Sequence, residues 1–222
     1  MKILYTKKIN EQMISENLGN HFSYDFVEVI RIDFLKIEAF DLEDKSIIFT
    51  SLNAVRSFFQ NQFKIKNNKI YCVGEKSADF LKSKGLSVSR IEKNADELAN
   101  FIIENCKNDK FVHFAGDLSL DILNEKLRTN GIFYQKEIIY KTILLNPKIE
   151  ENYDALVFFS PSGVRSFAQR NSLENKILFS IGKTTEKELQ KFTKQEIFTS
   201  SENNLQDLLK LIKSRENTDS KK

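Results

Sequence analysis

The sequence predicts an α/β protein with two similar domains, each built on a parallel β-sheet, and three observations support this fold class. Short apolar runs alternate with segments of helical spacing, as they do in parallel sheets covered by helices. The chain of 222 residues repeats itself once, at an offset of about half its length. Both copies of the repeat also contain a long extended stretch at the same place.

Six apolar runs rich in Ile, Val and Phe are the predicted strands. In order, they cover residues 2–5, 47–49, 70–73, 111–114, 155–159 and 177–181. Helices are predicted after most of them, because apolar residues recur there at helical spacing. The clearest examples follow the second and fourth strands, at Ala54, Val55, Phe58 and Phe59 and at Leu120, Ile122, Leu123 and Leu127.

The seven glycines mark the ends of these elements. Three close a helical pattern, where glycine adopts a positive φ without a side-chain clash: Gly19, Gly85 and Gly131. The other four lie in strand-to-helix turns or at helix starts, where they allow tight turns: Gly74, Gly116, Gly163 and Gly182.

The internal repeat is carried by four matches at nearly one offset. Residues 49–58 resemble residues 158–167, and the tetrapeptide Val-Arg-Ser-Phe is identical in both. The other matching pairs are Gly74 with Gly182, residues 3–5 with 112–114, and residues 28–30 with 137–139. The period is too long for a solenoid, so the repeat indicates two similar α/β units.

The extended stretches at 27–40 and 136–146 are longer than a usual strand, and they predict a two-stranded β-ladder that links the domains. If the chain crosses at both, the first domain comprises residues 1–32 plus 145–222 and the second comprises 33–144. The linker strands then lie near 30–38 and 138–146. A single cut near residue 109 is the alternative division. The tail 214–222 has no apolar residue, so we expect it to be disordered.

Composition excludes several classes of function. The net charge of +3 gives no strong footprint of a nucleic-acid-binding protein. No apolar run is long enough to span a bilayer, and the N-terminus lacks the pattern of a secretory signal. We therefore expect a cytoplasmic protein that binds neither nucleic acid nor membrane, with Cys72 and Cys106 as free thiols.

The sequence lacks the motifs of the common cofactor sites. His21, His113, Cys72 and Cys106 have no zinc-site spacing, and His113 falls inside a predicted strand as a core residue. Neither a glycine-rich dinucleotide motif nor a phosphate-binding loop is present. The sequence thus predicts no metal and no organic cofactor.

Six further motifs occur in order along the chain. They begin at Phe49, Val73, Phe114, Ile139, Phe159 and Ile181, and read Phe-Thr-Ser-x-Asn-Ala-Val, Val-Gly-x-x-Ser-Ala, Phe-Ala-Gly-Asp, Ile-Tyr-Lys-Thr, Phe-Ser-Pro-Ser-Gly and Ile-Gly-x-Thr-Thr. As an ordered set they resemble the uroporphyrinogen-III synthase family. The resemblance implies two α/β lobes joined by a two-stranded ladder, with the site in the cleft between them. It also implies the substrate, hydroxymethylbilane, and suggests transient handover from hydroxymethylbilane synthase.

A linear tetrapyrrole with many carboxylates needs hydrogen-bond donors, and the predicted turns supply them. Helix starts after strands present unpaired backbone N–H groups and the positive end of the helix dipole. The resemblance implies substrate-binding roles for Lys7, Thr50, Ser51, Asn53, Gly74, Ser77, Gly116, Ser160, Ser162, Thr184 and Thr185. Ser, Thr and Asn at such positions are also ordinary helix caps, and both roles can hold together. Arg56 and Arg165 are expected in exposed salt bridges.

The reaction implied by the resemblance needs few catalytic side chains. A hydroxymethylpyrrole loses hydroxide readily, and the unaided closure gives the isomer without inversion. Selectivity through a spiro intermediate must therefore come mainly from orientation of the substrate. Tyr140 matches the family's tyrosine and is the candidate general acid, because a phenol can donate a proton to the departing hydroxide.

A non-catalytic two-lobed module that binds a small anionic ligand is the alternative function. Such a sensor would show the same repeat and the same hydroxyl-rich turns. The motif around Tyr140 and the two Gly-x-x-Ser/Thr turns in register favour the enzyme.

Overall fold

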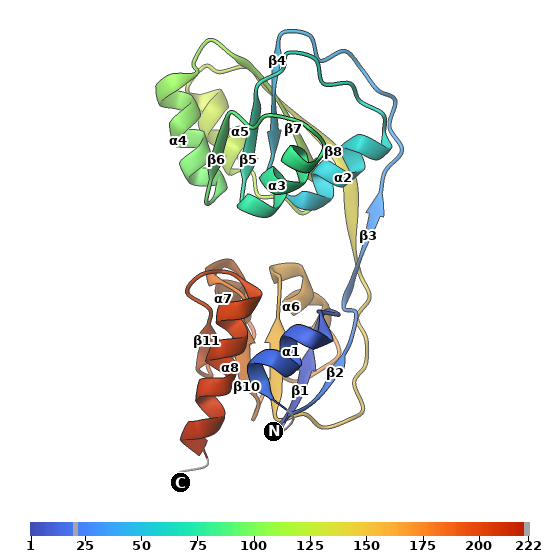
Figure 1. The fold of residues 1–222 in the computed structure, drawn as a ribbon, viewed down its shortest axis with the longest axis vertical. Helices are drawn as coiled ribbons and strands as arrows, with labels where there is room; N and C mark the ends of the chain where they lie inside the picture. The colour runs from blue at the N-terminus through green and yellow to red at the C-terminus, as the bar shows by residue number, and fades with distance from the viewer. Residues whose placement is uncertain (20–21, 220–222) are drawn as a thin grey trace. The chain divides into compact units, whose positions relative to one another are not determined.

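The computed structural model describes residues 1–19 and 22–219, with side chains described as far as Arg215. His21 and the tail residues 220–222 lie outside the described part. Contacts within the chain divide it into unit 1, Met1–Arg31 with Ile143–Lys222, and unit 2, Ile32–Thr142 (Figure 1). Each unit contains one largely parallel sheet with helices on both faces, which confirms the predicted α/β class.

Unit 1 has a five-stranded parallel sheet in the order β11-β10-β9-β1-β2. Its strands are β1 (Lys2–Tyr5), β2 (Ser23–Phe26), β9 (Ala155–Phe158), β10 (Ile177–Ser180) and β11 (Ile197–Thr199). Apolar side chains of α1 (Glu11–Leu18) and α8 (Leu205–Asp219) pack on one face, and those of α6 (Pro161–Ala168) and α7 (Lys183–Leu189) pack on the other. The central strands are buried on both faces, which explains their continuous apolar sequence.

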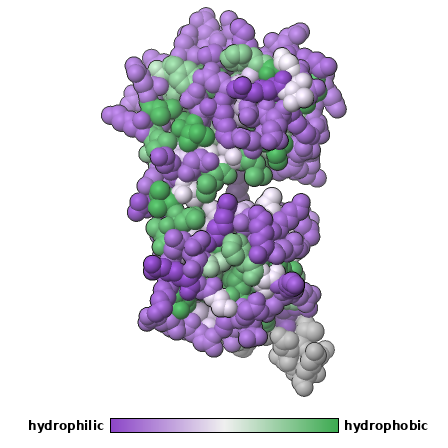
Figure 2. Space-filling view, turned by 180° about the vertical axis from the view of Figure 1, so that it is seen from behind, coloured by the Kyte–Doolittle hydropathy of each residue, from purple (hydrophilic) through white to green (hydrophobic). Residues whose placement is uncertain are grey.

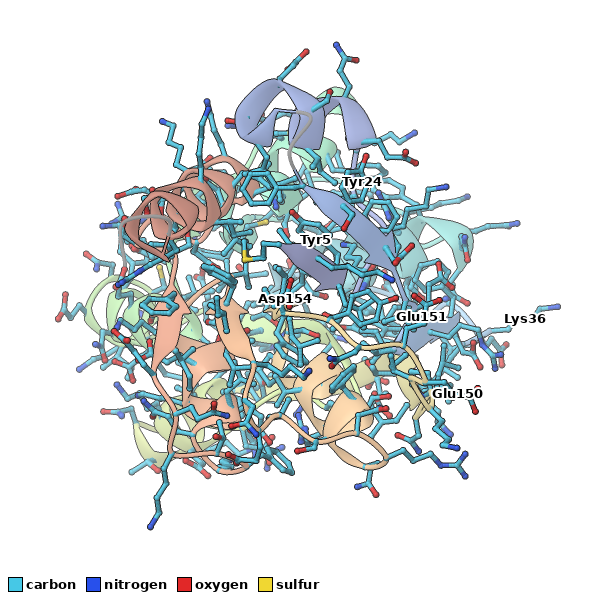
Figure 3. The ribbon with its side chains drawn as sticks, turned by 90° about the horizontal axis from the view of Figure 1, so that it is seen from below. Tyr5, Tyr24, Lys36, Glu150, Glu151 and Asp154 are labelled. Carbon is cyan, nitrogen blue, oxygen red and sulfur yellow. The ribbon has the colours of Figure 1, made fainter. Side chains whose placement is uncertain are left out.

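The first face of unit 1 includes an aromatic group at the end of β1. Tyr5 is fully buried, and its ring centroid lies 6.1 Å from that of Tyr24 in an edge-on contact (Figure 3). Burial raises the pKa of Tyr5, and its hydroxyl has no hydrogen-bond partner within the described structure. Tyr5 therefore serves as a packing residue.

Unit 2 has a six-stranded sheet in the order β3-β8-β7-β4-β5-β6. Its strands are β3 (Ile30–Phe34), β4 (Lys45–Phe49), β5 (Ile70–Val73), β6 (Arg90–Glu92), β7 (Lys110–Gly116) and β8 (Tyr134–Leu144). Apolar residues of α2 (Leu52–Gln60) and α3 (Glu75–Ser83) cover one face, and those of α4 (Ala95–Asn105) and α5 (Ile122–Thr129) cover the other.

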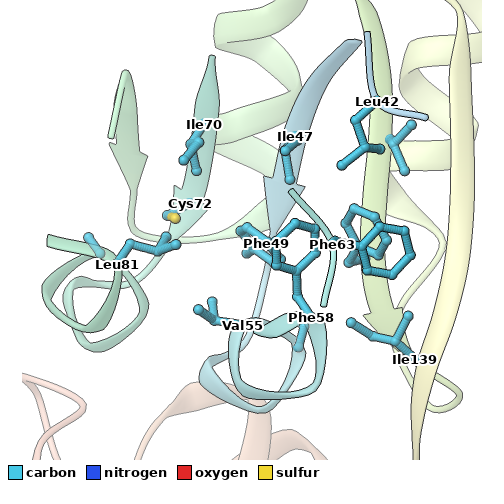
Figure 4. Packing of buried hydrophobic residues seen from close by; sticks show 14 residues of the cluster. Leu42, Ile47, Phe49, Val55, Phe58, Phe63, Ile70, Cys72, Leu81 and Ile139 are labelled. Carbon is cyan, nitrogen blue, oxygen red and sulfur yellow. The ribbon is translucent and has the colours of Figure 1, made fainter. Parts of the chain in front are cut away.

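Phenylalanine rings form the centre of the unit 2 core (Figure 4). Phe58 from α2 lies 4.8 Å, centroid to centroid, from Phe114 of β7 and 5.3 Å from Phe49 of β4, both in edge-on contacts. Phe63 stacks on Phe58 at 5.0 Å. Such ring pairs add to the free energy gained by burial alone, and they fix α2 against the sheet.

The two predicted linker strands pair with each other. The N–H of Leu35 donates to the carbonyl of Ile139, and the N–H of Leu145 donates to that of Val29. Residue numbers rise along one strand as they fall along the other, so β3 and β8 run antiparallel. The first stretch is shorter than the predicted 27–40, because β3 ends at Phe34.

Two further predictions were wrong. Ser214 and the residues as far as Asp219 belong to α8 rather than to a disordered tail. They include neither Gly nor Pro, so a polar composition alone does not end a helix that begins in the folded core. Leu120 lies before α5 and is 68% exposed, so it takes no part in the predicted apolar face of that helix.

Other predictions are confirmed. Gly19, Gly85 and Gly131 all have positive φ, between 71° and 77°. Cys72 and Cys106 are free thiols. The sequence missed β2, β6 and β11, which are short edge strands whose residues are only partly buried, so they lack the apolar runs of the central strands.

The repeated Val-Arg-Ser-Phe segment has the same structural role in both units. In unit 2, the hydroxyl of Ser57 donates to the carbonyl of Ile139 at 2.5 Å. Asn61 then donates to the carbonyl of Leu35 and accepts from the N–H of Ile37, both at 2.8 Å. These bonds attach the segment that follows β3 to the C-terminal end of α2.

Unit 1 contains the equivalent bonds. Ser166 donates to the carbonyl of Val29 at 2.5 Å. Asn171 donates to the carbonyl of Pro147 at 2.7 Å and accepts from the N–H of Ile149 at 2.8 Å. We refer to each Ser and Asn pair, Ser57 with Asn61 and Ser166 with Asn171, as a linker clamp, because it binds the backbone of the two crossing segments.

Replacing Asn61 with Ala tests the unit 2 clamp. The change leaves the Leu35 carbonyl and the Ile37 N–H without their partner, so we expect the free energy of unfolding to fall by about 2–3 kcal/mol. Urea unfolding followed by circular dichroism measures this change. In the control Asn130→Ala, the lost bond to the Lys126 carbonyl is exposed, and we expect a loss below about 0.5 kcal/mol. Equal losses in the two variants would contradict the assignment.

Candidate functional site

The polar turns of unit 2 gather at one edge of its sheet. Strands β4, β5 and β7 are parallel, so their carboxyl ends lie at the same edge. Ser51 follows β4, Gly74 follows β5, and Gly116 is the last residue of β7. This carboxyl edge is the usual place for a site in an open α/β sheet.

A β-bulge brings Tyr140 to this edge. The register of β7 with β8 shifts between Ala115, which pairs with Ile138, and Gly116, which pairs with Tyr140. Ile139 is the inserted residue, and its side chain is fully buried. Bulges of this kind redirect side chains and occur often beside active sites.

The phenol of Tyr140 contacts two of the other predicted site residues. Its oxygen lies 3.0 Å from Oγ of Ser51. A Cβ atom added to Gly116 would lie only 2.3 Å from Cζ of Tyr140. Glycine is therefore required at position 116 for the ring to occupy this place, and Tyr140, Ser51 and Gly116 form one cluster.

Ser51 has a second role as the cap of α2. Its Oγ accepts from the N–H of Ala54 at 3.1 Å. The hydroxyl thus both caps the helix and lies within hydrogen-bond distance of the phenol. Asn53 is half-buried in the first turn of the same helix.

The surroundings of Tyr140 keep its phenol protonated. Burial raises the pKa of Tyr140 above its ordinary value, and the nearby carboxylate of Asp117 acts in the same direction. The hydrogen bond to Ser51 acts in the opposite direction. The phenol is therefore a donor of a hydrogen bond or a proton at neutral pH.

Thr50 is half-buried, and its hydroxyl contacts a core residue. Its Oγ1 lies 2.9 Å from Nε2 of His113, whose Nδ1 lies 2.6 Å from the hydroxyl of Tyr134. His113 is 1% exposed, and burial lowers its pKa to about 3. The prediction of a hydrogen-bonded core histidine is confirmed.

The predicted residues of unit 1 lie at the carboxyl edge of its own sheet. Ser160 caps α6, and its Oγ accepts from the N–H of Gly163 at 3.0 Å and lies 3.2 Å from Oγ of Ser162. Lys7 follows β1 and is exposed. Thr184 is exposed in the first turn of α7.

Two predicted residues are buried. Thr185 is 1% exposed, and its N–H donates to the carbonyl of Gly182 at 3.0 Å. Ser77 is 3% exposed at the third position of α3, where a backbone N–H has no partner within the helix. Both side chains are therefore shielded from solvent.

The two arginines of the repeat differ in their contacts. Nε of Arg165 lies 3.6 Å from the carboxylate of Glu188, as expected for a salt bridge. The guanidinium of Arg56 lies 5.9 Å from the ring centroid of Phe80.

Sequence reasoning missed two polar residues at these edges. Asp117 follows Gly116 directly and lies within one of the six motifs, but the motif alone predicts no role for it. Asn203 lies over Gly182, where an added Cβ would come within 2.5 Å of Oδ1 of Asn203. The sequence gives little indication of a role for Asn203, because this residue lies in a loop without any motif, where it adopts a positive φ.

The described ranges, 1–19 and 22–219, contain neither a metal-site cluster nor a membrane-spanning helix. No group of three His, Cys, Asp or Glu side chains there has the arrangement of a metal site. None of the helices there is both long and apolar enough to cross a bilayer. On the face drawn in Figure 2, apolar side chains reach the surface among hydrophilic residues.

Comparison with known families decides the identity. The sequence profile of the family described as uroporphyrinogen-III synthase HemD matches residues 26–215. The chain belongs to the uroporphyrinogen-III synthase family. Members of this family are cyclising lyases of haem biosynthesis that act on hydroxymethylbilane.

Solved structures agree with the fold. A uroporphyrinogen-III synthetase from Helicobacter pylori is 19% identical, with a TM-score of 0.72, and the match covers 96% of this chain and 99% of that one. A mutant uroporphyrinogen III synthase from Thermus thermophilus is 13% identical, with a TM-score of 0.64 and full coverage of both chains. None of the curated proteins compared matches the sequence.

The buried His113 predicts a pH dependence of stability. Its pKa is lowered from 6.5 in the unfolded chain to about 3 in the folded protein, so between these values only the unfolded state binds the proton. Stability contributed by His113 is therefore present above pH 6.5 and is lost as the pH falls toward 3.

We expect His113 to account for a loss of about 2 kcal/mol in the free energy of unfolding between pH 7 and pH 5. Urea unfolding at both pH values checks this, with His113→Gln as the comparison. The variant should lose about 2 kcal/mol less than the original protein over the same interval. Parallel losses in the two proteins would contradict a neutral, buried imidazole.

Proposed function

We propose that this chain cyclises hydroxymethylbilane to uroporphyrinogen III, with Tyr140 as the proton donor to the departing hydroxyl group. One observation carries the assignment of the residue. The phenol of Tyr140 is held at the carboxyl edge of a parallel sheet, bonded to Ser51 and fitted against Gly116, in a chain of the uroporphyrinogen-III synthase family.

The protonated phenol suits the first chemical step. As the carbon–oxygen bond of the hydroxymethyl group breaks, the pyrrole nitrogen supplies electrons and the ring becomes an azafulvene. Proton transfer from Tyr140 converts the departing hydroxide into water. Ser51 stands within hydrogen-bond distance of the phenol, so it can stabilise the phenolate that remains.

Ring inversion then depends on which carbon attacks. Attack by the substituted carbon of the last ring gives the spiro intermediate, which breaks and closes again with that ring inverted. Loss of a proton from the ring carbon restores the aromatic pyrrole and returns a proton to the phenolate of Tyr140. The overall change is loss of one water, and the protein supplies mainly orientation.

Backbone and hydroxyl donors suit the carboxylates of the substrate. Helices α2 and α6 both begin at a capping serine, and their first N–H groups lie at the positive end of the helix dipole. The other donors that we propose as substrate contacts are Lys7, Asn53, Ser162 and Thr184 through their side chains, and Gly74, Ser77 and Gly116 through their backbone. Thr50 and Thr185 are proposed to support these turns from inside.

We also propose that hydroxymethylbilane synthase hands the substrate directly to this protein in the cytoplasm. The free substrate closes without a catalyst to the isomer that has no inverted ring, so direct transfer would prevent this loss.

Replacing Tyr140 with Phe removes the proton donor and keeps the ring against Gly116. We expect turnover to fall by more than about tenfold while the protein stays folded. The assay supplies hydroxymethylbilane and separates the oxidised products by isomer. Tyr134→Phe is the matched control, since Tyr134 is a buried tyrosine of the same strand, and its hydroxyl meets His113 instead.

We expect the control to keep turnover within about threefold of the original protein. Near-normal turnover of Tyr140→Phe would remove Tyr140 from the mechanism. Formation of the type I isomer alone, with and without the original protein, would defeat the proposed function itself.

A further inference from the structure

The loop of residues 117–121 joins β7 to α5 and is fastened to β8 at both ends. At its far end, Nζ of Lys136 donates to Oδ1 of Asp121 at 2.8 Å and to the carbonyl of Ser119 at 3.3 Å. At its near end, Asp117 contacts β8 directly. The loop therefore has a defined position beside the strand that carries Tyr140.

Asp117 binds β8 on both sides of Lys141. The backbone N–H of Asp117 donates to the carbonyl of Tyr140 at 3.2 Å. Its Oδ1 accepts from the N–H of Thr142 at 2.9 Å. The paired register of β7 and β8 ends at Gly116 with Tyr140, so the carboxylate takes the place of a strand carbonyl for the next N–H along β8.

Asp117 also acts on Tyr140 through its charge. The side chain is exposed, and no ion pair of Asp117 is found among the described residues. Its carboxylate lies close enough to the phenol to raise the pKa of Tyr140, in addition to the larger effect of burial. Both the hydrogen bonds and the charge of Asp117 therefore act on Tyr140.

We propose that Asp117 is a positioning residue, which holds the backbone of Tyr140 at the bulge so that the phenol meets the substrate. This inference rests on the proposed function of Tyr140. Asp117 touches no reacting atom, and its effect on turnover passes entirely through Tyr140.

Two variants separate position from charge. Asp117→Ala removes the acceptor for the Thr142 N–H, whereas Asp117→Asn keeps an oxygen in the same place. We expect Asp117→Ala to lower kcat by about tenfold with KM within about twofold, and Asp117→Asn to stay within about threefold of the original kcat.

The same substitution in the Tyr140→Phe background tests whether the effect passes through the phenol. We expect Asp117→Ala to change the kcat of Tyr140→Phe by less than about twofold, because contacting residues that act together are not additive. An equal loss in both backgrounds, or no loss in either, would overturn the proposal.

Hydrogen exchange of the Thr142 amide gives a readout that needs no substrate. We expect Asp117→Ala to speed this exchange by about tenfold or more, and Asp117→Asn to preserve the protection. Unchanged protection in Asp117→Ala would overturn the proposal even in a protein without activity. A protein that forms only the type I isomer fails the proposed function instead, so the two failures are distinguishable.

Discussion

The hydrogen bond from Ser57 to the carbonyl of Ile139 is the contact on which the site depends. Ile139 is the residue that the β-bulge inserts, and its neighbour is Tyr140. Ser51 caps the same helix α2, and its hydroxyl lies 3.0 Å from the phenol oxygen. Helix α2 thus contacts the bulge through Ser57 and the phenol of Tyr140 through its cap, Ser51. The packing that fixes α2 against the sheet therefore also fixes the position of the phenol.

The sequence predicted this arrangement in part. Two copies of Val-Arg-Ser-Phe were visible as a repeat, and in the structure the serine of each copy, Ser57 and Ser166, binds a backbone carbonyl of a linker segment. The parallel sheets, the glycine caps and the buried His113 also followed from apolar runs and residue types. These features depend on local pattern, which a single sequence contains.

The β-bulge at Ile139 and the contacts of Asp117 could not be predicted from the sequence pattern. Ile139 lies between Ile138 and the aromatic Tyr140, so the inserted residue leaves no visible break in the sequence of β8. The bonds from Asp117 to Tyr140 and Thr142 join positions more than twenty residues apart, which no spacing rule predicts. The helical residues from Ser214 to Asp219 also did not follow from pattern, because a segment without apolar residues predicts disorder.

The central claim is that the reaction needs the protonated phenol of Tyr140, and the pH dependence of kcat tests it most directly. Burial raises the pKa of Tyr140 above its ordinary value of 10.0, so kcat should stay level through neutral pH and fall only above about pH 10. Tyr140→Phe should lack this alkaline fall. An identical profile in Tyr140→Phe, or a fall of the original protein's kcat near pH 7, would contradict the account.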